Sequence, residues 1–297
     1  MKSGKEVIPY LAGIYKQLYV APGSDGAEEK YKAIVRRGED VEKRALTHFA
    51  TSDDDRLEMA DTPAGKVCVI TLFERKDFET FLQIMANRCT PKPIPISQGA
   101  AIIDGVINWE KINVHKKKFY EKEIENGHLF SDWSKEFKDF TSEKGNYLDA
   151  LIVLSTSPYS GINASEAGLS DDKWLFYSMI IRKYHECTHF MCRRMFPEKI
   201  DAVWDEVVAD AVGIYAAFGN YDTKMAMLFL GIDENGYKGG RLENYLKNDD
   251  KDPVSKKEEL NELAKRVNEM ILSFSKTILA NKIENPFDIA LILETNK

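Results

Sequence analysis

Residues 171–196, DDKWLFYSMIIRKYHECTHFMCRRMF, decide how the rest of this sequence is interpreted. Ser170 stands directly before the run, where its hydroxyl can act as a helix N-cap. Asp171 and Asp172 then put negative charge at the positive end of the helix dipole. Pro197 comes directly after the run and cannot continue a helix. These signals predict one long helix that ends before Pro197.

Two histidines lie four positions apart in the second half of this predicted helix. Four residues make little more than one helical turn, so the side chains of His185 and His189 leave the same face about 6 Å apart. This spacing suits two ligands of one tetrahedral metal ion. Glu186 lies about 100° around the helix from His185, too far to share the ligand shell easily but able to touch a water on the metal. The HExxH pattern therefore predicts two metal ligands and one general base.

A third ligand is available on the next predicted helix, residues 198–219. Glu206 and Asp210 are four positions apart and share one face. Their neighbours are apolar: Val207, Val208, Ala211 and Val212. Two acids in so apolar a helix are costly to bury without a partner, and a metal with its histidines is such a partner. We expect Glu206 to be the third ligand and Asp210 to hydrogen-bond the far ring nitrogen of a ligating histidine, which leaves the fourth metal position for water.

This combination resembles the gluzincin branch of the zincin metallopeptidases, in which an HExxH helix precedes a helix with a glutamate ligand and, four residues on, an aspartate. The resemblance covers residues 147–220. It implies one Zn²⁺ per chain and hydrolysis of an amide bond in a peptide or protein substrate. The residue roles that it implies are zinc ligands at His185, His189 and Glu206, a catalytic base at Glu186 and a supporting carboxylate at Asp210.

The resemblance also implies the fold. We expect an α+β protein with a zincin-like core, in which a small mixed β-sheet packs on the active-site helix and further helices lie towards both ends of the chain. In such folds a strand ahead of the HExxH helix commonly forms the edge on which an extended peptide lies. Residues 101–109 and 148–156 are the candidates for that strand.

Two other interpretations stay open. His185 and His189 can be a hydrogen-bonded pair of core histidines in a helical protein without a metal. Alternatively, a catalytically inactive zincin-like protein binds zinc and acts as a binding module. The glutamate at position 186 favours the enzyme, because a purely structural site has no use for a base beside an open coordination position.

Gluzincins usually add a tyrosine or histidine that steadies the oxyanion. The candidates here are Tyr215, Tyr221, Tyr237 and His128. Each of them fits an ordinary packed or surface position as well. Arg241 stands in the glycine-rich stretch 236–246, GYKGGRLENYL, where it can bind a substrate carboxylate or simply be a surface arginine beside a turn.

Shorter patterns predict the remaining elements. Helix-like spacing covers residues 5–20, 27–49, 77–88, 222–230 and 253–281. Strands are expected at 66–73 and 147–156, a strand or hairpin arm at 100–112, and an extended connection at 90–97. We divide the chain into an N-terminal helical segment (1–62), a zincin-like metallopeptidase core (63–235) and a C-terminal helical segment (236–297).

Composition excludes several classes of protein. The 297 residues are 43% hydrophobic and 30% charged, which is typical of a globular protein. The net charge of −7 argues against a nucleic-acid partner, because binding to phosphate backbones depends on clustered Lys and Arg. Without a signal-like N-terminus or a run of about 18 apolar residues, we expect no membrane span and a cytoplasmic location. The four cysteines form no CxxC pair and are expected to be free thiols; oligomeric state is not determined by the sequence.

Overall fold

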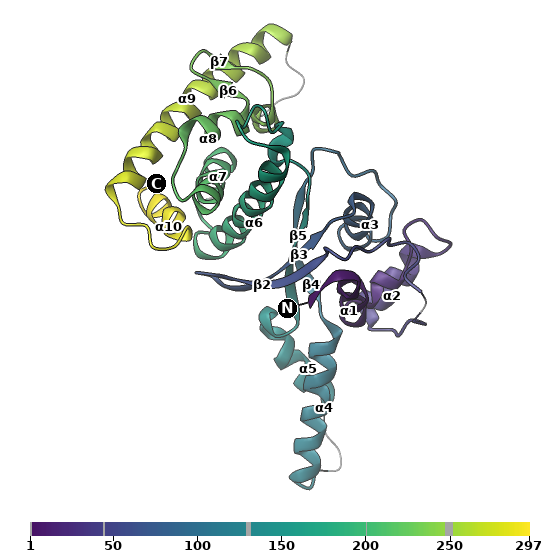
Figure 1. The fold of residues 1–297 in the computed structure, drawn as a ribbon. Helices are drawn as coiled ribbons and strands as arrows, with labels where there is room; N and C mark the ends of the chain where they lie inside the picture. The colour runs from purple at the N-terminus through teal and green to yellow at the C-terminus, as the bar shows by residue number, and fades with distance from the viewer. Residues whose placement is uncertain (1, 44, 129–131, 200, 247–251) are drawn as a thin grey trace. The chain divides into compact units, whose positions relative to one another are not determined.

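The fold is of the α+β class, with one five-stranded sheet and a larger set of helices. The computed structural model describes residues 2–43, 45–128, 132–199, 201–246 and 252–297. Two compact units can be distinguished. Unit 1 comprises residues 1–58, 68–95 and 101–153, and unit 2 comprises residues 59–67, 96–100 and 154–297. Figure 1 shows the elements of both units along the chain.

Most of the sheet belongs to unit 1. Its strands are β1 (Lys2–Ser3), β2 (Arg56–Thr62), β3 (Gly65–Leu72), β4 (Ala100–Ile107) and β5 (Leu148–Ser155), in the spatial order β1-β2-β3-β5-β4. Residues 151–154 of β5 are all buried, as expected for a strand with neighbours on both sides. Of the two strands expected as a substrate edge, β4 stands at the end of the sheet, whereas β5 lies between β3 and β4.

The helices of unit 1 complete its core. Unit 1 contains α1 (Val7–Ile14), α2 (Ala27–Arg37), α3 (Arg75–Met85), α4 (Trp109–Glu125) and α5 (Trp133–Ser142), with the short 3₁₀ helices η1 (Gly4–Glu6), η2 (Lys16–Tyr19) and η3 (Lys144–Asn146). Apolar residues of α1, α2 and α3 form one hydrophobic cluster with the strands. Helices α4 and α5 pack on each other through aromatic rings: His115 stacks on Phe140 at 4.0 Å between ring centroids, and Phe119 lies 5.8 Å from Trp133.

Unit 2 is mainly helical. It contains η4 (Tyr159–Gly161), α6 (Asp171–Met195), α7 (Ala202–Phe218), α8 (Thr223–Leu230), η5 (Arg241–Tyr245), α9 (Pro253–Ala280) and α10 (Phe287–Thr295), with the small hairpin β6 (Ile232–Asp233) and β7 (Gly236–Tyr237). Figure 1 shows α7 surrounded by α6, α8, α9 and α10. The stretch 207–214 of α7 is buried without interruption, which fits a helix covered on all sides.

Most of the predicted helices and strands are confirmed. Helix α6 begins after Ser170 and ends at Met195, two residues before Pro197. Helices α7, α8 and α9, strands β3 and β5, and the extended connection at 90–97 also lie where the sequence places them. None of the helices in the described ranges is long and apolar enough to cross a membrane. None of the four cysteines, all of which lie in the described ranges, forms a disulfide.

Two expectations near the N-terminus are wrong. The helix predicted over 27–49 ends at Arg37, because Gly38 adopts a left-handed conformation (φ 66°) and closes α2. Strand β2 lies inside the segment 1–62 that was expected to be helical, where it pairs with β1. Helices α4 and α5 were not predicted at all. The division of the chain at residues 62 and 235 stays a prediction.

Candidate metal centre

The site is built where α6 and α7 lie close together. Gly213 on α7 faces Ile181 on α6, and a Cβ atom added at Gly213 would stand 2.8 Å from the Ile181 main-chain oxygen. Only a residue without a side chain allows the two helices to approach so closely at this point. This packing fixes the HExxH face of α6 against the face of α7 that carries Glu206 and Asp210.

Three donor groups meet between the two helices. The Nε2 atoms of His185 and His189 are 3.0 Å apart. A Glu206 carboxylate oxygen lies 3.2 Å from His189 Nε2, and the other lies 3.5 Å from His185 Nε2. Ligands at about 2.0–2.1 Å from a tetrahedral zinc ion are separated by about 3.3 Å. The donor set of two imidazoles and one carboxylate, with these separations, therefore fits Zn²⁺.

Asp210 contacts His185 at Nδ1, the ring nitrogen that faces away from the other donor atoms. Its Oδ1 atom lies 2.9 Å from His185 Nδ1, and both groups are buried. A proton on Nδ1 that is donated to Asp210 leaves the Nε2 lone pair free for a metal. Asp210 thus lies where the sequence predicts it.

Tyr159, in η4, is a further member of this buried group, and nothing in the sequence pointed to it. Its hydroxyl donates to Asp210 Oδ1 at 2.6 Å and lies 2.8 Å from His185 Nδ1. The backbone N–H of Tyr159 donates to the buried Ser178 hydroxyl on α6. A loop residue is therefore fixed to the same helix that carries the histidines.

Arg241, in η5, lies on the other side of Asp210. Its guanidinium forms a very short ion pair with Asp210, donates to the Tyr159 hydroxyl at 3.1 Å, and stands 3.9 Å from Glu206. Its side chain is mostly buried, and Nε has no hydrogen-bond partner among the described residues. Arg241 is therefore not a surface arginine. Its side chain also lines the cavity beside the histidines, and its contact with a substrate carboxylate stays a prediction.

The electrostatics of the site favour a charged Glu206. Burial alone would raise the pKa of Glu206, but the hydrogen bond from His189 and the charges of His185 and Arg241 outweigh it and lower this pKa. Burial would likewise lower the pKa of His185, whereas the hydrogen bond to Asp210 and the nearby carboxylates raise it. A site that holds this much negative charge beside two imidazoles is suited to a cation.

Arg182 keeps the Tyr159 loop in position. Its guanidinium is buried and donates to the main-chain oxygens of Ser155 and Ser157 at 2.9 and 2.8 Å. Gly99 lies against this guanidinium, and a Cβ there would stand 2.8 Å from Nε. The Gly99 main-chain oxygen in turn accepts a bond from the Ser155 N–H at 2.8 Å. Arg182 is therefore a structural clamp that lies one turn before His185.

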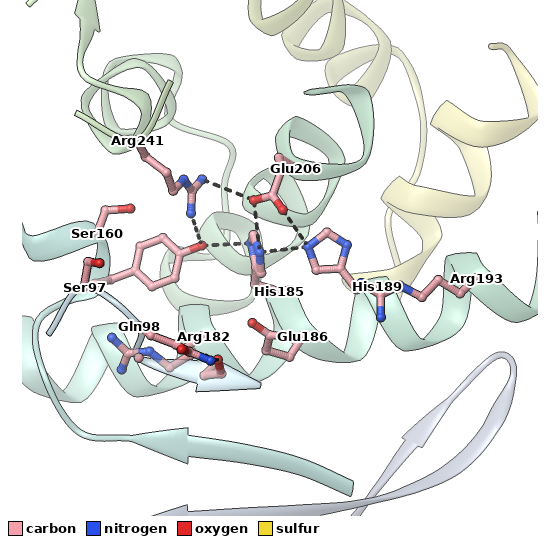
Figure 2. Close-up of a pocket in the computed structure, with 13 residues that line it drawn as sticks. Ser97, Gln98, Ser160, Arg182, His185, Glu186, His189, Arg193, Glu206 and Arg241 are labelled. Atoms are coloured by element: carbon pink, nitrogen blue, oxygen red, sulfur yellow. Dashed lines mark hydrogen bonds and ion pairs between the residues drawn. The ribbon is translucent and has the colours of Figure 1, made fainter. Parts of the chain in front are cut away.

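A cavity of about 320 Å³ opens onto the donor groups (Figure 2). Its walls include the extended segment 97–100, Ser160, Arg193 and the donor groups themselves. Glu186 lines it, partly exposed, and its carboxylate forms no hydrogen bond or ion pair with any described residue. The expected base is therefore adjacent to the donor atoms and open to a solvent molecule, as its position on α6 predicts.

The other residues singled out from the sequence lie elsewhere. Neither Tyr215 nor Tyr221 is among the described residues that line this cavity. Burial, together with the nearby charge of Asp210, raises the pKa of Tyr221, and its hydroxyl has no partner in the described chain. The hydroxyl of Tyr237 exchanges hydrogen bonds with the Gly240 main chain. His128, in unit 1, is exposed and lies 3.1 Å from Glu123.

Tyr245 is a further tyrosine that contacts one of the three donor groups, Glu206. Burial and a hydrogen bond to Glu206 raise its pKa, although the charge of Arg241 acts in the opposite direction. Tyr245 and Arg241 belong to the same 3₁₀ helix, η5. One short element of unit 2 thus contacts both Glu206 and Asp210 of α7.

Comparison with known proteins adds a family but no activity. The chain belongs to the family of unknown function DUF7005, whose sequence profile matches residues 20–295. No curated protein and no solved structure matches the chain.

Proposed function

We propose that this protein is a zinc-dependent hydrolase that cleaves peptide bonds, with a zincin-like core of the gluzincin type. The observation that carries the proposal is the meeting of three ligand atoms, from His185, His189 and Glu206, within 4.8 Å of one another beside an open cavity. An unengaged carboxylate, Glu186, lines the same cavity. A buried pair of histidines without a metal would require neither the third donor nor the cavity.

Zinc, when bound by these three residues, supplies a Lewis acid that lowers the pKa of a coordinated water to about 7 and polarises a substrate carbonyl. Glu186 accepts the proton of the attacking water and passes it to the leaving amine, as a general base and then a general acid. The cavity volume of about 320 Å³ leaves room for substrate atoms beside a water molecule, which occupies about 30 Å³.

The groups behind the ligands keep them in position. Asp210 fixes the tautomer of His185, so that Nε2 faces the metal position. Tyr159 and Arg241 hold Asp210 by hydrogen bonds and an ion pair, which leaves the aspartate no freedom to turn away. Tyr245 holds the Glu206 carboxylate by a hydrogen bond. These residues orient the site and do not themselves touch the scissile bond in this scheme.

The decisive experiment combines metal analysis with the Glu186→Gln variant. We expect the purified protein to retain about one zinc per chain after dialysis. The parent should hydrolyse members of a broad peptide mixture, and E186Q should lose at least about 10²-fold in rate because it cannot accept the proton. E186Q should keep its zinc, since residue 186 is not a ligand.

Two further variants serve as references. His189→Gln removes a ligand and should lose both zinc and hydrolysis. His128→Gln changes an exposed histidine of unit 1 and should lose neither. Zinc binding by the parent without hydrolysis of any peptide would instead indicate the inactive binding protein, and the absence of zinc would exclude both.

A further inference from the structure

A second cavity, of about 250 Å³, adjoins the candidate metal centre. It shares three lining residues with the first cavity, namely His189, Arg193 and Glu206. Figure 2 shows Arg193 beyond His189 along α6. The remaining walls come from the C-terminal end of α6, from Phe196 and Lys199 in the connection to α7, from the first turns of α7, and from the C-terminal end of α10. A ligand bound at the zinc position therefore has room beside His189 for one long side chain.

The walls of this second cavity carry carboxylates. Asp205 and Glu206 come from α7, and Glu294 comes from α10. Glu294 is only 1% exposed. Its Oε1 accepts a hydrogen bond from Trp204 Nε1 at 2.8 Å, but its Oε2 has no partner among the described residues. An unpartnered buried carboxylate oxygen is costly and indicates that something else supplies a donor.

The nearby cations do not satisfy Glu294. The ammonium group of Lys199 donates a hydrogen bond to the main-chain oxygen of Glu294, at 2.6 Å, and not to its carboxylate. Lys297 lies 3.6 Å from Asp205. Arg193 is exposed at the boundary of the two cavities. Burial raises the pKa of Glu294, which agrees with a carboxylate that lacks a full counter-charge.

We propose that this cavity is a substrate subsite that binds a cationic side chain, lysine or arginine, next to the scissile bond. The ammonium or guanidinium would be placed between Asp205 and Glu294, and the methylene stem would run past Cys192 and Phe196. A neutral side chain would leave Glu294 Oε2 unpartnered, and an acidic one would face three carboxylates. This inference rests on the proposed function, because the subsite is defined by its distance from the zinc ligands.

Amino-acid hydroxamates test the subsite without requiring turnover. The hydroxamate group chelates zinc, and the side chain of each compound samples the neighbouring cavity. We expect calorimetry on the zinc-loaded protein to show lysine hydroxamate binding at least about tenfold more tightly than norleucine hydroxamate, which has a similar length without the charge. Glutamate hydroxamate should bind most weakly.

Variants assign the preference to this cavity. Glu294→Gln should reduce the lysine-over-norleucine ratio by about fivefold or more, while the affinity for norleucine hydroxamate stays unchanged. Glu262→Gln, an exposed site on α9, is the matched control and should change neither. Should E294Q fail to fold, Asp205→Asn is expected to show the same loss of preference.

The outcomes separate the two proposals. Equal binding of lysine and norleucine hydroxamates would overturn the subsite and leave the zinc site standing. A preference for glutamate would also overturn it and would assign recognition to Arg193 instead. A parent protein that binds neither zinc nor any hydroxamate would overturn the proposed function and the subsite together.

Discussion

A single hydroxyl group connects most of the buried charges at the candidate site. Tyr159 donates to Asp210, contacts the Nδ1 side of His185 and accepts a hydrogen bond from Arg241. Because Asp210 is 1% exposed, water cannot easily replace a lost partner there. The position of the His185 imidazole therefore depends on a residue outside the proposed ligand set.

Tyr159→Phe should show this dependence. The variant leaves one Arg241 N–H without its acceptor and removes one of the two hydrogen-bond donors to Asp210 Oδ1, so we expect a loss of about 1–3 kcal/mol in unfolding free energy. Zinc affinity should fall by about tenfold, as is usual when a group behind a metal ligand is removed. Competition with a chromogenic chelator measures the affinity. Tyr120→Phe, at a tyrosine that is 40% exposed, is the control, and equal affinities for both variants would contradict the positioning role.

The residues that the sequence places together are those whose relation is local. His185, Glu186 and His189 share one helix, and the spacing of Glu206 and Asp210 on the next helix follows from the same 3.6-residue period. Tyr159 and Arg241 reach Asp210 from 51 and 31 residues away in sequence. No periodicity relates loop residues to a helix at such separations. The sequence therefore did not indicate Tyr159, and it suggested Arg241 only as a possible substrate contact and not as a partner of Asp210.

At the level of elements, the close approach of α6 and α7 is the feature most open to a test. Gly213→Ala would place a methyl group 2.8 Å from the Ile181 main-chain oxygen. Relieving this contact requires a shift of the α6 or α7 backbone, which costs free energy. We expect unfolding free energy to fall by about 1–3 kcal/mol. Zinc affinity should fall as well, because the ligands are divided between these two helices.

Gly13→Ala is the matched control for that substitution. Gly13 is also inside a helix, α1, but it is exposed and nothing lies within 4 Å of an added Cβ. Alanine there should stabilise the protein by about 0.5–1 kcal/mol, since glycine is the poorer helix former. Thermal unfolding measures both variants. A Gly213→Ala protein as stable as the parent would show that the two helices do not approach as described.

Elements were predictable where apolar spacing or capping signals were strong. Helix α6 has its acidic first turn and its terminating proline, and β5 has an uninterrupted apolar run. Helix α4 has a capping asparagine, Asn108, but weak apolar spacing: only Ile112 is buried, and aromatic rings of α4 pack on those of α5. Strand β2 lies between β1 and β3 in the sheet, and its residues 56 and 57 pair with residues 2 and 3. Such distant pairing leaves no local signature in the sequence.

For the whole molecule, the zinc proposal makes the two units differ in their response to metal. All three ligands belong to unit 2, whereas the hydrophobic cluster that includes Phe78, Phe81 and Leu82 belongs to unit 1. A ligand that binds only the folded state stabilises it by about 4 kcal/mol at a free concentration 1,000 times its dissociation constant. That stabilisation acts on the part of the chain whose opening releases the metal.

Hydrogen exchange measured with zinc and with a chelator resolves this response by segment. We expect zinc to slow exchange at amides of α6 and α7, by up to about 10³-fold for amides that exchange only when the ligands separate. Amides of α3 and of residues 68–72 of β3, which belong to unit 1, should keep their rates. The ligand-deficient His189→Gln protein should show no effect of zinc in either unit. Equal slowing in both units would mean that they open as one cooperative structure, and no slowing at α6 in the parent would remove the metal from its proposed position.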